Sequence, residues 1–134
     1  MINVYIIDSL NEIDLKLRGV NTTYFDDEIK ALNAVEESQL SVVLINYAQL
    51  KEGTVEYLKV ITVISPSSNT VVIGDGLDDL GILSCLVAGA KGYQSLEQLN
   101  KYAERLIKVV DAGEVWITRR MVSTLLDALR GQMR

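Results

Sequence analysis

Three short runs of apolar residues stand out along the chain, at positions 2–7, 42–45 and 71–73. Each is rich in β-branched residues, and its apolar positions are nearly continuous rather than alternating. Such runs are typical of strands that are buried on both faces, as in a parallel sheet. Two further candidates, at 22–25 and 92–93, are short and partly polar, which suits places nearer a sheet edge. The pattern therefore predicts five strands.

The segments between these strands carry apolar residues at helical spacing. The residues predicted to face inward are Ile29, Leu32 and Val35 in the first helix, Val55, Leu58 and Thr62 in the second, Leu83, Leu86 and Val87 in the third, and Leu99, Ala103, Leu106, Ile107 and Val110 in the fourth. The sequence at 95–98 has the form of a capping box that opens the fourth helix. Positions 10–18 are a weaker candidate for one more helix. Alternating strands and helices predict an open parallel sheet with helices on both faces.

A further amphipathic helix is predicted after this α/β unit is complete. Thr118 can cap it. Its apolar stripe, at positions i, i+3, i+4 and i+7, consists of Val122, Leu125, Leu126 and Leu129. The stripe can pack on its own domain, on another copy of the chain or on a following domain. Its arginines, of which the last is Arg134, more often form a solvated face than a DNA contact.

The composition narrows the chemistry that is possible. The 134 residues are enough for one domain with a core, and 49% of them are hydrophobic. The chain has no histidine, which excludes Ser-His-Asp triads and histidine-ligated metals. Cys85 is the only cysteine, so neither an internal disulfide nor a four-cysteine metal site can form. A net charge of −5 argues against broad nucleic-acid binding.

Targeting signals are not apparent in the sequence. No stretch approaches 18 consecutive apolar residues, so we expect no membrane-spanning helix. The N-terminus lacks a positive region followed by a small-residue cleavage site, and it reads as a strand instead. We therefore expect a cytoplasmic protein without membrane contact.

Two segments in the second half of the chain carry a resemblance to a known family. Gly89-Ala-Lys-Gly-Tyr93 is similar to the Gly-Ala-x-Gly-Tyr segment that enters the fifth strand of bacterial response-regulator receiver domains. Residues 109–121 are similar to the segment of LuxR/NarL-type regulators in which Gly-Glu-x-Trp precedes a linker helix. The resemblance implies a flavodoxin-like (CheY-like) doubly wound five-stranded parallel sheet with an extra C-terminal linker helix. It divides the chain into a receiver-like domain, 1–113, and a linker or dimerisation helix, 114–134, with the family's DNA-binding domain absent.

The same resemblance assigns roles that this sequence does not fill. Receivers accept a phosphoryl group from a partner kinase on an aspartate, with the help of Mg²⁺. The acceptor position falls on Asn46, whose neutral amide is not the required nucleophile. Asp8 retains one carboxylate of the acidic pair, while Ser9 stands at the other position, and Gly74 and Leu96 replace the hydroxyl and the lysine. The chain therefore resembles a degenerate receiver, without cofactor, metal or enzymatic activity.

Each of these residues also has a simpler interpretation. Asp8 and Ser9 can terminate a strand and cap the next turn, which we favour over a metal-site remnant. Asn46 can be a hydrogen-bonding turn residue as well as the mimic of an acceptor locked in one state. Trp116 can anchor a partner, or it can pack the linker helix onto its own domain.

Three functions follow as hypotheses. In the first, the chain works through protein contacts, as a homodimer or with a partner regulatory protein, and controls transcription through a DNA-binding domain not present here. Its interface would use Tyr93 and Tyr102, with Trp116 and the stripe from Val122 to Leu129 as further contacts. In the second, the emptied pocket binds a small molecule. The third is residual phosphotransfer, against which the missing nucleophile argues.

Overall fold

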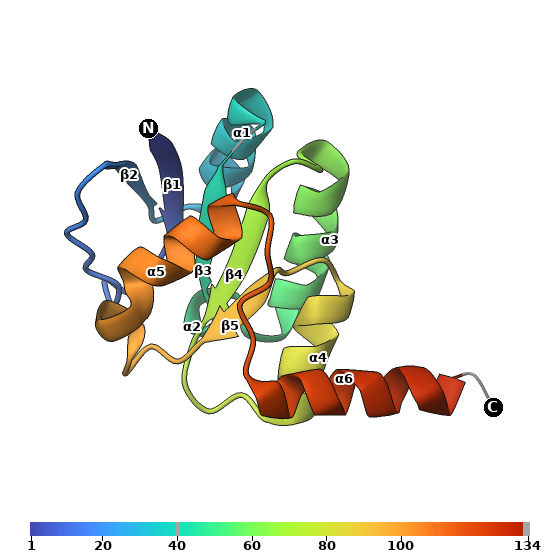
Figure 1. Ribbon diagram of the computed structural model, residues 1–134. Coiled ribbons are helices and arrows are strands. Elements are labelled where there is room, and N and C mark those ends of the chain that lie inside the picture. The colour runs from blue at the N-terminus through green and yellow to red at the C-terminus, as the bar shows by residue number, and fades with distance from the viewer. Residues whose placement is uncertain (40, 133–134) are drawn as a thin grey trace.

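The predicted strands form one parallel sheet in the computed structural model, which describes residues 1–39 and 41–132 (Figure 1). The strands are β1 (Ile2–Ile7), β2 (Val20–Phe25), β3 (Val42–Asn46), β4 (Asn69–Ile73) and β5 (Gly92–Gln94). Their spatial order is β2-β1-β3-β4-β5, and every neighbouring pair is parallel. The predicted five-stranded parallel sheet is therefore confirmed. Strands β3 and β4 are almost fully buried and β1 is buried toward its carboxyl end, as their continuous apolar runs require.

Helices follow most of the strands. They are α1 (Glu28–Ser38), α2 (Tyr47–Leu50), α3 (Thr54–Ile64), α4 (Asp79–Val87), α5 (Leu99–Asp111) and α6 (Arg119–Gln132), with a 3-10 turn η1 (Lys51–Gly53) between α2 and α3. The short helix α2 and the turn η1 were not predicted, because four and three residues are too few to show a periodicity. No helix within the described residues is long and apolar enough to span a membrane.

The connection from β1 to β2, residues 8–19, is an extended loop, which we call the crossover loop. The prediction of a helix at 10–18 is therefore wrong. Ile13 and Leu15 are both buried, with Leu17 packed partly against the same core. Apolar residues at every second position are the pattern of an extended chain, since a helix would turn Leu15 about 200° away from Ile13. This alternation in the sequence indicates an extended chain and not a helix.

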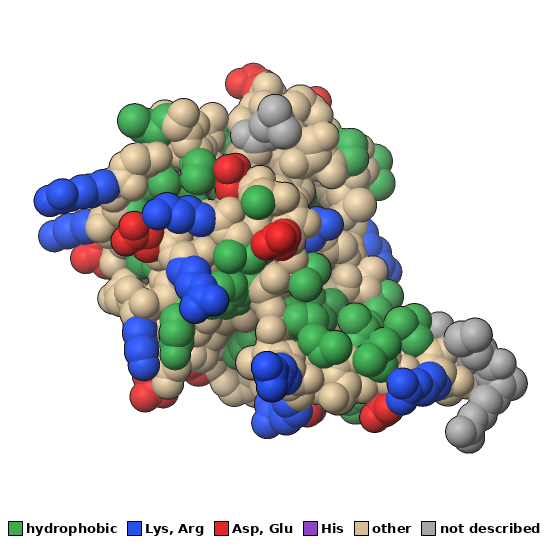
Figure 2. All heavy atoms as spheres, in the orientation of Figure 1, with side chains coloured by type: hydrophobic (Ala, Val, Ile, Leu, Met, Phe, Trp, Pro, Cys, Tyr) green, Lys and Arg blue, Asp and Glu red, His purple; other side chains and the backbone are tan. Residues whose placement is uncertain are grey.

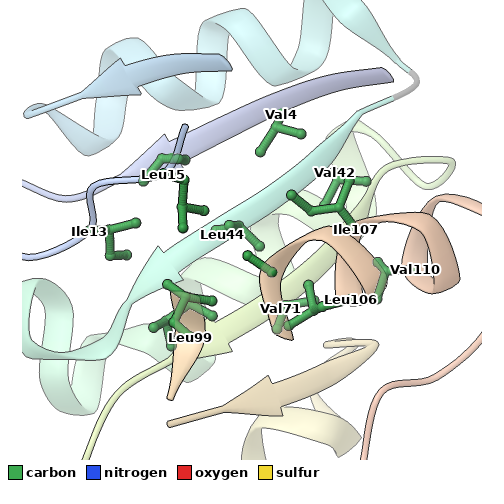
Figure 3. Packing of buried hydrophobic residues seen from close by; sticks show 13 residues of the cluster. Val4, Ile13, Leu15, Val42, Leu44, Val71, Leu99, Leu106, Ile107 and Val110 are labelled. Atoms are coloured by element: carbon green, nitrogen blue, oxygen red, sulfur yellow. The ribbon is translucent and has the colours of Figure 1, made fainter. Parts of the chain in front are cut away.

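Two apolar cores lie on the two faces of the sheet. On one face, α5 and the crossover loop cover the strands, and Figure 3 shows the leucine, isoleucine and valine side chains of α5 meeting those of β1, β3 and β4. The five residues predicted to face inward on α5 are all buried. On the other face, α1, α3 and α4 cover the strands.

Other predicted helix faces were partly wrong. Ile29 and Val87 are 63% and 75% exposed, whereas Ala31 and Cys85 face the core. Six of the nine positions of α4 are apolar, so its sequence does not distinguish one face, and the contact with α3 decides which residues are buried. Thr62 is exposed as well, and its hydroxyl donates to the carbonyl of Leu58 in its own helix.

The capping box predicted at 95–98 does not form. Helix α5 begins at Leu99, and its N-cap Gln98 makes no side-chain hydrogen bond to the helix. The amide of Leu99 donates instead to the carbonyl of Leu96, which closes a turn ahead of the helix. The Ser95 hydroxyl lies 3.3 Å from the side-chain nitrogen of Gln94, so it is engaged in the preceding strand.

The segment 114–118, which we call the strap, runs beside β5 before α6 begins. Trp116 forms an isolated parallel bridge with Gly92: its amide donates to Lys91 (2.8 Å), and its carbonyl accepts from Tyr93 (3.1 Å). The Thr118 hydroxyl accepts from the amide of Met121 at 3.1 Å, which confirms the predicted cap of α6. Helix α6 then contacts α4 and extends beyond it (Figure 1). Arg134 lies outside the described residues.

Candidate functional site

A pocket of about 460 Å³ opens at the carboxyl ends of β3 and β4. This is where open parallel sheets commonly bind ligands. Its lining consists of Glu12, Asn46, Tyr47, Ala48, Lys51, Glu52, Gly74, Asp75 and Leu96. The structure thus brings together three of the five residues assigned by resemblance: Asn46, Gly74 and Leu96. Asp8 lies behind Asn46, whereas Ser9 is exposed, and its amide donates to the side-chain oxygen of Gln49 at 2.6 Å.

The Asn46 amide is fully buried and fully engaged. Its nitrogen donates to Asp8 Oδ1 and to Glu12 Oε1, both at 2.9 Å. Its oxygen accepts from the amide of Ala48 at 3.1 Å and so caps the start of α2. Only the nitrogen end of an amide can donate to two carboxylates, so this network fixes the orientation of the side chain. Asn46 therefore bridges the two carboxylates that converge on it.

Asp8 anchors the crossover loop. Only 4% of this residue is exposed, and its second oxygen, Oδ2, accepts from the amide of Ile13 at 2.6 Å. Its first oxygen is the partner of Asn46. Both oxygens are thus occupied by N–H donors, and the loop that carries Ile13 into the core is held at the end of β1.

The donor set does not fit the Mg²⁺ ion that the family resemblance implies. Mg²⁺ requires about six oxygen ligands in near-octahedral geometry. Here Asn46 presents its nitrogen, not its oxygen, to Asp8 and Glu12, so the amide stands where a cation would be needed. In the part of the chain that the structure describes, no group of three Asp, Glu, His or Cys side chains is placed to hold a metal.

Gly74, at the position of the family's hydroxyl, is buried beside Tyr47. A Cβ atom at residue 74 would lie 3.0 Å from the Cβ of Tyr47. A serine or threonine there would therefore press on Tyr47. The carbonyl of Gly74 accepts from the Tyr93 hydroxyl, and its amide donates to the carbonyl of Gln94 at 3.1 Å. Burial, and then the charges of Asp75 and Cys85, raise the pKa of Tyr93.

Six residues of the pocket lining were not among the predicted site residues: Glu12, Tyr47, Ala48, Lys51, Glu52 and Asp75. Glu12 escaped because 10–18 was taken as a helix, although it lies four residues after Asp8. Tyr47 and Lys51 belong to the short elements α2 and η1. Lys51 is the one basic residue of the lining. Leu96 packs against the core beneath α5.

The residues predicted as interface anchors are partly used within the chain. The ring of Trp116 lies 6.3 Å from that of Tyr102, and its indole N–H donates to Gln94 Oε1 at 3.0 Å. Tyr93 is bound to Gly74. These contacts support the interpretation that Trp116 packs the linker onto its own domain.

The stripe of α6 remains largely uncovered. Val122, Leu126 and Leu129 are 41%, 44% and 49% exposed, and Leu125 is half-buried. Met121 is buried, and Arg120 forms an ion pair with Asp79 at the start of α4, at 3.0 Å. Figure 2 shows hydrophobic side chains gathered over α6 and the adjoining surface. The first turn of α6 is thus docked, and an apolar face continues beyond it.

Comparison with known proteins was informative only at the level of structure. No protein-family model matches the chain, and no curated protein does either. The isolated receiver domain of RcsB from Salmonella enterica serovar Typhimurium is similar, with a TM-score of 0.75 and 16% identity over 95% of this chain and 99% of that one. A LuxR-family two-component response regulator from Aurantimonas sp. SI85-9A1 gives 0.77 and 13% identity, over 94% and 96% of the two chains.

A third similar structure is a LuxR-family DNA-binding response regulator from Silicibacter pomeroyi, with a TM-score of 0.70 and 18% identity over 90% of this chain and 99% of that chain. This chain therefore has the fold of the receiver domains of LuxR-family response regulators, as the sequence resemblance predicted.

Proposed function

We propose that this chain is a receiver-fold regulatory module that is not phosphorylated at residue 46 and acts through protein contacts. The observation that carries the proposal is the Asn46 amide, which is buried between Asp8 and Glu12 with both of its N–H groups engaged. An amide nitrogen has no lone pair available to attack phosphorus, so it cannot replace an aspartate nucleophile. The module is accordingly not an enzyme.

The surrounding groups support the same conclusion. A metal at Asp8 would compete with hydrogen bonds already made, since one oxygen binds Asn46 and the other binds the amide of Ile13. Gly74 and Leu96 offer neither a hydroxyl nor an ammonium group to phosphoryl oxygens. The groups that would supply the chemistry are thus replaced by hydrogen bonds and apolar contacts that stabilise the fold.

The output side of the module lies in the strap and α6. We assign residues 1–113 to the receiver-like domain and 114–134 to a linker or dimerisation helix. The stripe of Val122, Leu125, Leu126 and Leu129 contacts another copy or a partner regulatory protein, because an apolar face of this kind is unfavourable in water. The module belongs to a cytoplasmic transcription regulator of the LuxR type, and DNA binding resides in a domain outside this chain.

Incubation with acetyl phosphate and Mg²⁺, followed by intact-mass measurement, tests the loss of phosphotransfer. The proposal predicts no mass increase, while a receiver with a complete site, treated in parallel, gains one phosphoryl group. A phosphoryl adduct on any aspartate of this chain would overturn the proposal.

The contact through α6 is tested separately by sedimentation velocity and by binding to partner regulators. The double variant Leu126→Glu and Leu129→Glu places charges on the exposed stripe, and it should weaken the association. Ser123→Glu, on an exposed position of the same helix outside the stripe, is the matched control. Equal association of all three proteins would remove α6 from the proposed interface.

A second candidate function, small-molecule sensing, is favoured by the pocket itself. Its volume of about 460 Å³ would accept a small metabolite, and Leu96 and Tyr47 give it apolar walls. A thermal-shift screen of metabolites tests this function: a stabilising compound whose effect is lost in Leu96→Lys supports it. A screen without any stabilising compound would remove the candidate.

A further inference from the structure

The two margins of the sheet differ in how their backbone groups are satisfied. Figure 1 shows β2 at one margin and β5 at the other. The strap covers β5 through the bridge of Trp116 with Gly92. Strand β2 pairs with β1 along its whole length and with no other described strand. Its outer side is therefore an open edge.

The register identifies the groups that face outward. The carbonyl of Phe25 accepts from the amide of Asp8, so the backbone of Phe25 faces β1. Backbone direction alternates along a strand, so Thr23 and Asn21 face β1 as well. The N–H and C=O groups of Val20, Thr22 and Tyr24 consequently point away from the sheet, and no backbone partner for them occurs among the described residues.

This edge lacks the devices that usually protect an edge strand. Strand β2 reads Val-Asn-Thr-Thr-Tyr-Phe, without a charged residue and without proline. Lysine, proline and bulges are the common means of preventing edge-to-edge pairing. Valine, threonine and aromatic residues, in contrast, are those that favour strand pairing. The edge is thus six residues long, regular and suited to accept another strand.

The sequence around β2 is self-complementary about Thr22. If two copies of β2 pair antiparallel with Thr22 opposite Thr22, Val20 lies opposite Tyr24 on both sides of the twofold axis. Thr–Thr pairs and pairs of an aromatic with a β-branched residue are favourable cross-strand neighbours. Just beyond the paired residues, Arg18 in the turn before β2 lies at the same end of the interface as Asp26 of the other copy, so oppositely charged side chains come near each other twice. Arg18 and Asp26 are both exposed, and neither forms an ion pair in the described part of the chain.

We propose that the open edge of β2 binds the same edge of a second copy of this chain, antiparallel and centred on Thr22. The two sheets then become one continuous sheet of ten strands, and the interface is isologous, as twofold symmetry requires. This pairing uses neither the Asn46 pocket nor α6. It is therefore independent of the proposed function.

The first test removes one outward N–H group. Thr22→Pro eliminates the central donor of the paired edge, but it leaves the hydrogen bonds to β1 intact, because the N–H of Thr22 does not face β1. Sedimentation equilibrium should show a dimer for the wild type and for the control Thr22→Val, and a dissociation constant raised roughly tenfold or more for Thr22→Pro. Far-UV circular dichroism verifies that each variant is folded.

The second test uses charge and does not depend on tolerance of proline. Arg18→Asp and Asp26→Arg each bring like charges near one another at both ends of the interface, so each should weaken the dimer. The double variant Arg18→Asp with Asp26→Arg restores opposite charges, and it should restore the dimer. Only a contact between residues 18 and 26 of two copies produces this rescue.

The outcomes separate this proposal from the contact through α6. Weakening by Thr22→Pro and by each single charge variant, together with rescue in the double variant, supports the β2 edge. A monomeric wild type, or a dimer that the β2 variants leave unchanged, overturns it. A dimer lost only in Leu126→Glu with Leu129→Glu assigns the association to α6 and likewise overturns the β2 edge, while leaving the proposed function intact.

Discussion

The strand-end pocket and the contact of the strap with β5 each contain a glycine beside a bulky residue. The two glycines differ in the atom that an added Cβ would meet. At Gly74, a Cβ atom would lie 3.0 Å from the Cβ of Tyr47, and a shift of residue Tyr47 by a few tenths of an ångström would relieve the contact. At Gly92, a Cβ atom would lie 2.3 Å from the carbonyl oxygen of Trp116, which is backbone. An added side chain at residue 74 of the pocket is therefore tolerated better than one at residue 92 beside the strap.

The same two regions also use buried amides in parallel ways. Asn46 ends β3 and holds the crossover loop through Glu12, and Gln94 ends β5 and holds the strap through the indole of Trp116. In both places, an amide at the carboxyl end of a strand fixes a segment that is not helical. The comparison teaches that one device, a buried amide at the end of a strand, holds a neighbouring non-helical segment at both places.

Gly92→Ala should give the largest effect. The added methyl group forces the strap away from β5, and we expect a loss of about 2 to 3 kcal/mol in the free energy of unfolding. Chemical denaturation measures the loss, and the fluorescence of the single tryptophan, Trp116, reports release of the strap. Gly74→Ala is the matched comparison, with a loss below about 1 kcal/mol expected. Equal losses would show that the two glycines are equivalent.

Asp8→Ala should come next, with a loss of about 2 kcal/mol. The substitution leaves the amide of Ile13 and one N–H of Asn46 without partners in a buried place. Asp14→Ala, an exposed position of the same crossover loop, should change stability by less than about 0.5 kcal/mol. Chemical denaturation of both variants checks whether Asp8 holds the loop, and similar values for the two would contradict this role.

Trp116→Phe should have a smaller effect, of about 1 kcal/mol. Phenylalanine retains a ring beside Tyr102, but it loses the N–H that donates to Gln94. Denaturation followed by circular dichroism measures the difference. The double variant with Gln94→Leu should add little further loss, because the partner is already unpaired; a fully additive loss would argue against the bond.

The smallest effect concerns pH and lies away from both regions. Hydrogen bonds from the amides of Lys30 and Ile29 lower the pKa of Asp27, which caps α1. Because the folded pKa is depressed, the stability this group contributes is present above its ordinary pKa of 3.8 and is lost as the pH falls through the folded pKa. Asp27→Asn keeps a good cap without a titratable group, so its stability should fall less steeply than that of the wild type below about pH 4.

Much of the fold followed from the sequence because buried strands and α5 have unambiguous apolar patterns. The crossover loop did not, although Ile13, Leu15 and Leu17 alternate as in an extended chain. The positions of Asn46, Gly74 and Leu96 in one pocket followed from the resemblance. Glu12 could not be found this way, since its contact with Asn46 depends on the path of a loop. The pairing of Trp116 with Gly92 joins residues 24 positions apart, for which local patterns carry no signal.

The most direct test of the central claim is the melting temperature of the wild-type protein with and without Mg²⁺ and beryllofluoride. Asn46→Asp is the comparison, because it sets a third carboxylate against Asp8 and Glu12, and this repulsion lowers stability until a divalent cation relieves it. The account predicts no change in Tm for the wild type and a Tm for Asn46→Asp that rises with Mg²⁺. A rise in the Tm of the wild type with Mg²⁺ and beryllofluoride would contradict it, because residue 46 would then lie in a working phosphoryl site.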